Sequence, residues 1–251
     1  MSSATLKHPD HAGDVPGESG PGQDELDLTA AINRKHPVAD QIYEALRDAI
    51  INVQIPPGAS ISENRICRHF GVSRTPVRSA MVRLSEDGLI DVYPQQGSFV
   101  APIRLAGIYD SHFVRKHLEI ALLREAASRW TPAMSAQARA IIEAQRKAIA
   151  ARDVTLFHRE DERFHHAFAV FANRKGVWDT ILLAKSRLGR FVRLFGKPER
   201  LPIVIKEHIA IIDALDAGEP DNAAERLEYH LDMIFIMLKQ LPDQYQHYLA
   251  D

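Results

Sequence analysis

Apolar residues recur at helical spacing where the chain first becomes rich in them, just beyond Pro37. They are Val38, Ile42, Leu46, Ala49 and Ile50. Residues three and four positions apart share one face of an α-helix, so this segment is predicted to be an amphipathic helix that runs to about Val53. The sequence Pro56-Pro57-Gly58 then prevents the helix from continuing.

Two shorter helices are predicted between residues 62 and 88. Ser62 can cap the first helix, and Gly71 allows a sharp turn after it. Ser73 can cap the second helix, and Gly88 ends it. Each helix has inward apolar positions: Ile66, Cys67 and Phe70 in the first, and Val77, Ala80, Met81 and Leu84 in the second. The pattern predicts a helix-turn-helix.

A hairpin is predicted directly after these helices. Two strand-like runs, residues 89–93 and 98–101, flank the turn sequence Pro94-Gln95-Gln96-Gly97. A hairpin in this position is typical of the wing of a winged helix-turn-helix. We therefore predict a DNA-binding domain of this kind over residues 36–102.

The pattern is helical from about Ile103 onward, without comparable strand signals. Breaks divide residues 103–240 into about six helices: Thr131-Pro132, Asp153, Asn173, Gly196-Lys197-Pro198 and Gly218-Glu219-Pro220. We expect an all-α antiparallel six-helix bundle with a ligand pocket at its centre. The fold class is therefore mostly α. Residues 1–35 are predicted to be a disordered arm because they are rich in Gly, Pro, Ser and Asp, and residues 241–251 are taken as a C-terminal tail.

Charge is distributed unevenly along the chain, although the net charge is only −2. Residues 1–33 contain one lysine and six acidic residues, whereas residues 65–83 contain five arginines and no acid. No apolar run is long enough to span a membrane or to serve as a signal peptide, which favours a cytoplasmic protein. Cys67 is the single cysteine, so a metal would have to be bound by histidines and carboxylates.

The arginine-rich segment coincides with the second helix of the helix-turn-helix. Arg74 and Arg78 lie one turn apart, on the face opposite the apolar stripe. In this motif the start of the second helix enters the major groove, where arginine can donate twice to guanine. Ser73 and Thr75 are placed to reach phosphates. A solvated helix face is the alternative for the helix alone, but the preceding helix, the turn glycine and the wing favour DNA binding.

These residues also resemble the winged helix of the GntR family of bacterial regulators. The similarity is carried by Pro56-Pro57-Gly58, Ser62-Glu63, GVSRTPVRSAMVRLSEDGLI over residues 71–90 and QGSFV over residues 96–100. It implies that Arg74, Thr75 and Arg78 are the main DNA-contacting residues. Ser73 and the wing around Gly97 would contact the DNA backbone. Four positions depart from the usual family residue: Val53 replaces Gly, Ser79 replaces Glu, and Asn64 and Gln96 stand where basic residues often occur.

Two metal-ligating residue types lie four positions apart in a predicted helix. Asp161 and His165 therefore share one helix face and could bind one ion. His208 and His230 lie in two later helices, which could fold back to bring both imidazoles to the first pair. The Asp161–His165 spacing alone is also common on solvated helices.

Residues 105–240 resemble the ligand-sensing FCD domain of the FadR subfamily. The similarity rests on Asp161, Phe164-His165, His208 and His230, and on Arg115 to Glu119, which match an R-x-x-L-E pattern. The resemblance implies that Asp161, His165, His208 and His230 bind a divalent transition metal. One carboxylate and three imidazoles favour zinc, with nickel, manganese or iron as alternatives. Arg115 is the candidate for binding the carboxylate of an effector, with a salt bridge to Glu119 as its alternative role.

The sequence thus predicts a ligand-responsive transcription regulator, with repression as the default. It would bind double-stranded operator DNA as a symmetric homodimer, because each chain offers one recognition helix, and would sense a small organic or sugar acid at its metal site. An enzyme with a metal in a helical bundle is a weaker alternative, since only Glu162 and His165 form a Glu-x-x-His pair. A further alternative is a regulator whose histidines are structural and whose effector is not an acid.

Overall fold

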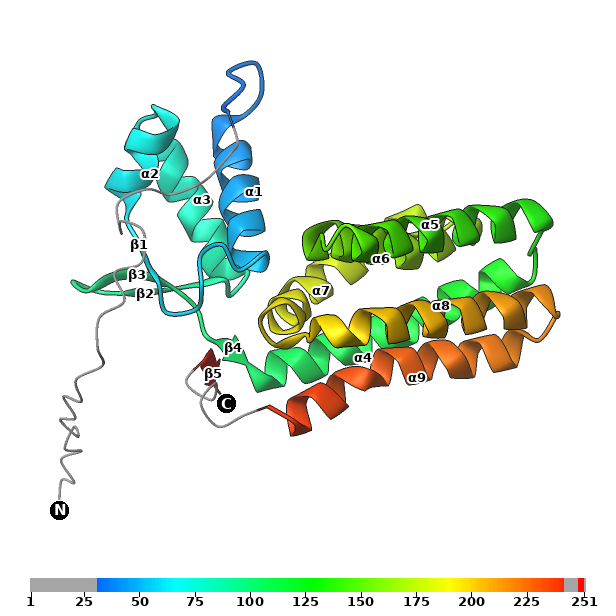
Figure 1. Cartoon of the computed structure of the whole chain (residues 1–251). Helices are drawn as coiled ribbons and strands as arrows, with labels where there is room; N and C mark the ends of the chain where they lie inside the picture. Colours follow the sequence, from blue (N-terminus) through cyan, green and yellow to red (C-terminus); the bar gives the residue numbers. More distant parts are fainter. Residues whose placement is uncertain (1–30, 242–247, 251) are drawn as a thin grey trace, which may run out of the picture.

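The computed structural model describes residues 31–241 and 248–250 of the chain (Figure 1). The predicted disordered arm, residues 1–35, therefore lies outside the described residues except for its last five. The same is true of most of the predicted C-terminal tail, residues 241–251. An N-terminal helix-and-sheet domain and a larger helical domain lie side by side, joined through a short extended segment (Figure 1).

The N-terminal domain contains the predicted helix-turn-helix and wing. Its elements are α1 (Val38–Ile51), β1 (Ser60–Ile61), α2 (Glu63–Phe70), α3 (Arg74–Glu86), β2 (Ile90–Tyr93) and β3 (Gly97–Val100). Ser62 caps α2 as expected by accepting a hydrogen bond from the Arg65 amide at 3.4 Å, and Gly71 has the left-handed φ of 62° that the turn requires. Ser73 precedes α3 but makes no side-chain capping bond, which corrects the expectation for that residue.

The wing is an antiparallel hairpin extended by one strand that the sequence pattern does not predict. In the hairpin Ile90 pairs with Val100 and Tyr93 with Gly97, as the turn sequence between them predicts. Strand β1 adds to the other edge, where Ser60 pairs with Phe99. A strand of two residues is too short to show alternation of apolar and polar positions, so its pairing could be seen only in three dimensions.

The C-terminal domain contains the six α-helices that the sequence predicted. They are α4 (Leu105–Ala127), α5 (Pro132–Ala150), α6 (Val154–Phe171), α7 (Lys175–Phe195), α8 (Leu201–Asp216) and α9 (Pro220–Lys239), with the short 3-10 helix η1 (Pro198–Arg200) before α8. Thr131 and Asp153 cap α5 and α6 through hydrogen bonds of 3.3 Å and 2.8 Å. Contrary to expectation, this part also contains a parallel two-stranded pairing of β4 (Ile103–Arg104) with β5 (Leu249–Ala250).

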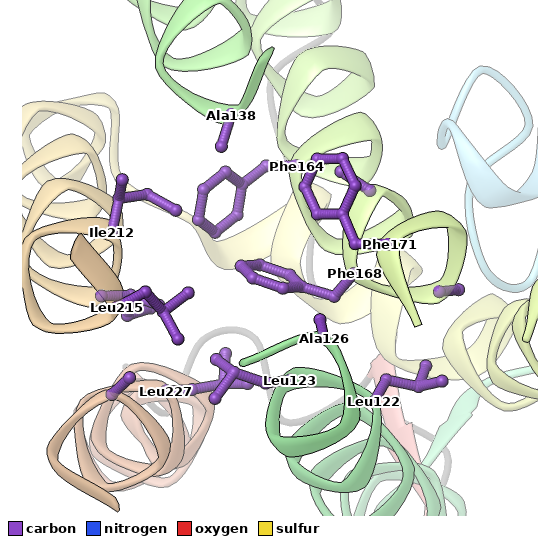
Figure 2. Packing of buried hydrophobic residues seen from close by; sticks show 14 of the residues in the cluster. Leu122, Leu123, Ala126, Ala138, Phe164, Phe168, Phe171, Ile212, Leu215 and Leu227 are labelled. Carbon is purple, nitrogen blue, oxygen red and sulfur yellow. The ribbon is translucent and has the colours of Figure 1, made fainter. Parts of the chain in front are cut away.

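Aromatic and aliphatic side chains from facing helices fill the interior of the bundle. Phe164 and Phe168 of α6 pack edge to face, with ring centroids 5.4 Å apart, and belong to one cluster with Leu123 and Leu215 of neighbouring helices (Figure 2). Leu123 and Phe164 are fully buried. Because His165 directly follows Phe164 in a helix, this packing fixes the rotation of α6 and the direction of the polar side chains beside it.

Helix α7 is the element through which the helical domain contacts the DNA-binding domain. It packs against α1 (Figure 1), and the buried guanidinium of Arg190 donates a hydrogen bond to the carbonyl of Ala101, in the segment between the domains. Arg104, four residues from the wing, binds both carboxylate oxygens of Asp91 in β2 at 2.9 and 3.0 Å. The junction is thus held by specific polar contacts as well as by packing.

Val53 occupies a backbone conformation that suits glycine. Its φ is 60°, which is unfavourable for a β-branched residue, and this is the position where the resembled family usually has Gly. We expect Val53→Gly to raise the free energy of unfolding by about 1 kcal/mol and the melting temperature by about 2–4 °C. Val53→Ala, which removes the branching but keeps Cβ, should give a smaller gain. Thermal unfolding of the variants followed by circular dichroism checks this, and an unchanged or lower melting temperature for the glycine variant would contradict it.

Candidate metal centre and DNA-binding face

The structure brings together the four residues that the sequence proposed as metal ligands. Asp161 and His165 lie one turn apart on α6, His208 comes from α8, and His230 from α9; one ligand atom from each lies within 4.8 Å of the others. His165 and His208 are buried, and the other two residues are partly buried. Helices α8 and α9 fold back toward α6, and this brings together residues that are far apart in the sequence.

Each imidazole of the cluster has an acceptor beside its Nδ1 atom. His165 Nδ1 lies 2.6 Å from Glu119 Oε2, His208 Nδ1 lies 3.1 Å from Gln145 Oε1, and His230 Nδ1 lies 2.7 Å from Glu207 Oε2. The contacts of His208 and His230 have hydrogen-bond geometry and favour the tautomer with the proton on Nδ1, which leaves Nε2 with a free electron pair. Such partners orient histidine ligands and make them more basic in known metal sites. The close approach of His165 to Glu119 lacks hydrogen-bond geometry.

The Arg115 side chain supports the same assignment for His165. Its Nη2 lies 3.0 Å from His165 Nε2, and because a guanidinium can only donate, that nitrogen is the acceptor. Arg115 Nε also lies 2.6 Å from Glu119 Oε1, so the salt bridge considered as its alternative role is present. Arg115 therefore contacts both a candidate ligand and the carboxylate that orients it.

The electrostatic environment favours neutral imidazoles at His208 and His230 and an ionised carboxylate at Asp161. Burial, followed by the neighbouring His230, lowers the pKa of His208 well below its ordinary value. Burial and then His165 lower the pKa of His230 to about 3. Burial alone would raise the pKa of Asp161, but the imidazoles of His165 and His208 outweigh it and lower that pKa. Metal binding requires these same protonation states.

The cluster fits a divalent transition metal. The buried Nε2 of His208 has no hydrogen-bond partner among the described residues and lies 3.6 Å from Asp161 Oδ1. An unpaired buried ring nitrogen costs free energy unless a ligand satisfies it. Three imidazoles and one carboxylate are the donors that zinc and similar metals prefer, and they are a poor set for calcium or magnesium.

Three residues that complete the site came from parts of the sequence with little local signal. The sequence predicts Glu119 only as a partner for Arg115 and does not predict Gln145 or Glu207 as site residues. Gln145 is fully buried in α5, and Glu207 is held by Arg200 at 3.0 and 3.1 Å. A buried polar residue in an apolar helix face was the one available signal for Gln145; nothing in its spacing points to His208.

The predicted DNA-contacting residues are all exposed. Ser73, Arg74 and Thr75 are exposed at the start of α3, and Gly97 is exposed at the wing turn. The Arg78 side chain is 64% exposed, and its Nε lies 3.1 Å from Glu63 Oε2 on α2. This ion pair, which the sequence analysis did not anticipate, joins the two helices and positions the Arg78 guanidinium.

Comparison with known proteins divides the chain into the same two domains as the structure does. Residues 38–100 match the model of bacterial regulatory proteins of the gntR family, and residues 110–233 match the FCD domain. The HTH-type transcriptional repressor RspR of Escherichia coli K12 is 32% identical over 228 residues, covering 90% of this chain and 100% of that protein. The chain belongs to the GntR family. It is a DNA-binding transcription regulator with an FCD effector-binding domain, not an enzyme.

Further relatives and solved structures agree with this family. An HTH-type regulator from an unstable DNA locus of Streptomyces ambofaciens is 33% identical, covering 77% of this chain and 82% of that protein. A putative GntR regulator from Rhodococcus sp. RHA1 has a TM-score of 0.68 at 27% identity, covering 81% of this chain and 99% of that one. Escherichia coli McbR/YncC shares the fold at a TM-score of 0.68 and 21% identity, covering 80% and 97%. Within the described residues of this GntR regulator, no helix has the length and apolar content needed to cross a membrane.

Substitution of Gln145 tests whether its hydrogen bond to His208 contributes to metal binding. Gln145→Leu would leave the Nδ1–H of His208 without its acceptor, so we expect metal affinity to fall about 10–100-fold. Gln145→Glu keeps an acceptor oxygen and should retain more of the affinity. Competition with a chromogenic chelator measures both values. Equal affinity of the leucine variant and the wild type would show that this hydrogen bond does not support the site.

Proposed function

We propose that this GntR regulator is a repressor whose hold on operator DNA is controlled by a small carboxylate that binds beside a metal ion. Asp161, His165, His208 and His230 are assigned as the metal ligands, with zinc first and nickel, manganese or iron as alternatives. The observation that carries the proposal is the convergence of three imidazoles, each with an acceptor at Nδ1, beside Arg115.

Arg115 and the cavities beside it support a carboxylate as the ligand. Arg115 and Asp161 line two cavities that meet at the cluster, so a small molecule there would reach both. A bound divalent metal supplies positive charge and open coordination positions for a carboxylate oxygen. The Arg115 guanidinium can donate two parallel hydrogen bonds to the same group.

The DNA-binding surface supports recognition by a homodimer. Each chain presents one α3 helix and one wing, and a single recognition helix of this kind gives limited affinity. A two-fold symmetric pair placing α3 of each subunit in successive major grooves would bind a near-palindromic operator. We assign Arg74, Thr75 and Arg78 to the groove, and Ser73 and the wing around Gly97 to the DNA backbone. Relief of repression then requires only that the effector change the distance or orientation of the two α3 helices.

The groove assignment predicts the effect of removing Arg78. Arg78→Ala should weaken binding to the operator about 10–100-fold and reduce discrimination against unrelated DNA, since a paired contact to guanine is lost. The matched control is Arg124→Ala, an exposed arginine at the end of α4 in the other domain. Fluorescence anisotropy with the DNA that flanks the gene gives both affinities. Unchanged selectivity of the Arg78 variant would place α3 outside the groove.

The metal assignment predicts the effect of removing two ligands. The double variant His208→Ala, His230→Ala should lose its bound metal and no longer respond to effector, while Arg74 and Arg78 still allow it to bind DNA. Elemental analysis of purified protein measures the metal, and operator binding with and without effector measures the response. A variant with the metal content of the wild type would disprove the ligand assignment.

A further inference from the structure

A cavity of about 400 Å³ lies at the junction of the two domains, between α1 of the DNA-binding domain and α6 and α7 of the helical domain. Arg115, His158 and Asp161 line this cavity and also the second, smaller cavity beside the metal cluster. We call it the interdomain chamber. Figure 1 shows α7 between α1 and the rest of the bundle, which is why a space beside α7 can border both domains.

Positively charged side chains outnumber acidic ones on the walls of the interdomain chamber. The cationic residues are Arg47, Arg115, Arg159, Lys185 and Arg193, and the acidic residues are Asp48, Asp161 and Glu162. Asp161 belongs to the metal cluster, so its charge is committed there. Arg115 is paired with Glu119, and Arg159 lies 3.8 Å from Glu160, so the positive charge that a small anion could compensate is that of Lys185 and Arg193.

Two of these cations have weak partners despite their burial. The Lys185 side chain is only 13% exposed, and its ammonium lies 3.7 Å from Glu162. Arg193 makes no ion pair within 4.0 Å with any residue in the described part of the chain. Burial lowers the pKa of both side chains, as expected for charges removed from water without full compensation. A buried cation is stable when a counter-charge is supplied.

The second cavity offers a different environment. Its volume is about 110 Å³, and its walls are mainly apolar, although Lys197 and Arg200 also line it. Of the two further cations there, Arg200 is held by Glu207 and Lys197 is exposed to water, so neither is a buried charge that lacks compensation. The interdomain chamber differs in that its cations Lys185 and Arg193 are largely buried and weakly paired.

We infer that the interdomain chamber binds a second anionic group of the effector, through Lys185 and Arg193. The effector is then a dianion, either a dicarboxylate or a phosphorylated carboxylate. This inference rests on the proposed function, in which the first carboxylate binds beside Arg115 and the metal. It adds a site for the other end of the molecule and assigns a chemical class to the ligand.

The position of the chamber gives the second anionic group a direct route to the DNA-binding domain. Arg47, Asp48 and Ile51 of α1 form its wall opposite the metal cluster. Gly189 of α7 keeps this junction close, because a Cβ atom there would lie 2.9 Å from Arg193 Nη1 and 3.7 Å from Ile51 Cγ2. Helix α1 in turn contacts α3 through Asp40 and Arg83, which are 2.6 Å apart. An anion bound at Arg193 therefore acts one helix away from the recognition helix.

Matched pairs of acids test the inference. Metal-loaded full-length protein is titrated by calorimetry with butyrate against succinate, valerate against glutarate, and glycerate against 3-phosphoglycerate. We expect at least one dianion to bind about 10–100-fold more tightly than its monoanionic partner, since its second group gains charge-assisted hydrogen bonds. The first two pairs and the third distinguish a carboxylate from a phosphate as the second group. No preference for a dianion in any pair overturns the inference.

Variants that remove one positive charge test whether Lys185 and Arg193 cause the tighter binding of the dianion. Lys185→Met and Arg193→Met keep an unbranched apolar stem and should bring the dianion and its monoanionic partner to similar affinity. Lys175→Met, an exposed lysine on the same helix, is the control and should keep the preference. Hydrogen exchange supplies a second readout: a bound dianion should protect residues 38–51 of α1, whereas its partner should not. A preference that survives in both chamber variants overturns the inference.

The outcomes separate this inference from the proposed function. Metal-dependent binding of monoanions and dianions with equal affinity would leave the proposed function intact and remove the interdomain site. The His208→Ala, His230→Ala variant should lose affinity for both acids of a pair. If its affinities equal those of the wild type, the carboxylate site beside the metal fails as well.

Discussion

The arrangement of this regulator depends on how three imidazoles inside the helical domain are turned toward one point. Glu119, Gln145 and Glu207 each place an acceptor at the Nδ1 atom of one histidine, which turns Nε2 of His208 and His230 toward the Asp161 carboxylate. Nε2 of His165 faces the same point and also accepts from Arg115. Buried polar groups are costly unless they are paired, and His208 Nε2 is unpaired within the described residues. An ion bound at the cluster would satisfy this nitrogen. The apolar packing around Phe164 fixes the position of the helix that carries Asp161 and His165, and so the place where the ion would bind.

Helix α7 connects this centre to the DNA-binding domain by ordinary packing and a few polar contacts. One side of the helix lines the cavities beside the metal cluster through Leu188 and Val192, and another meets α1 at Gly189. Arg190 binds the carbonyl of Ala101 in the connecting segment. A ligand that moves α7 has two physical routes to the recognition helix, one through α1 and one through the connecting segment and the wing. Such coupling requires only a modest difference in ligand affinity between two arrangements of the domains.

The sequence predicted the parts of this structure that depend on local pattern. The helix-turn-helix, the hairpin and the six helices of the bundle follow from apolar periodicity, caps such as Thr131 and Asp153, and glycine or proline breaks, all of which act within a few residues. Strands β1, β4 and β5 were missed because two residues show no periodicity. Asp161 and His165 could be paired from their spacing, whereas His208 and His230 were placed only through the family resemblance. Gln145 reaches His208 from a helix some sixty residues earlier, a contact that tertiary packing alone creates.

X-ray absorption spectroscopy of the metal-loaded full-length protein tests the central claim most directly, because it reports which atoms bind the ion. We predict about one metal ion per chain, with scattering from three imidazoles and from oxygen and, for zinc, nitrogen distances of about 2.0–2.1 Å. A first coordination sphere made of oxygen atoms alone, or one that contains the sulfur of Cys67, would contradict the account.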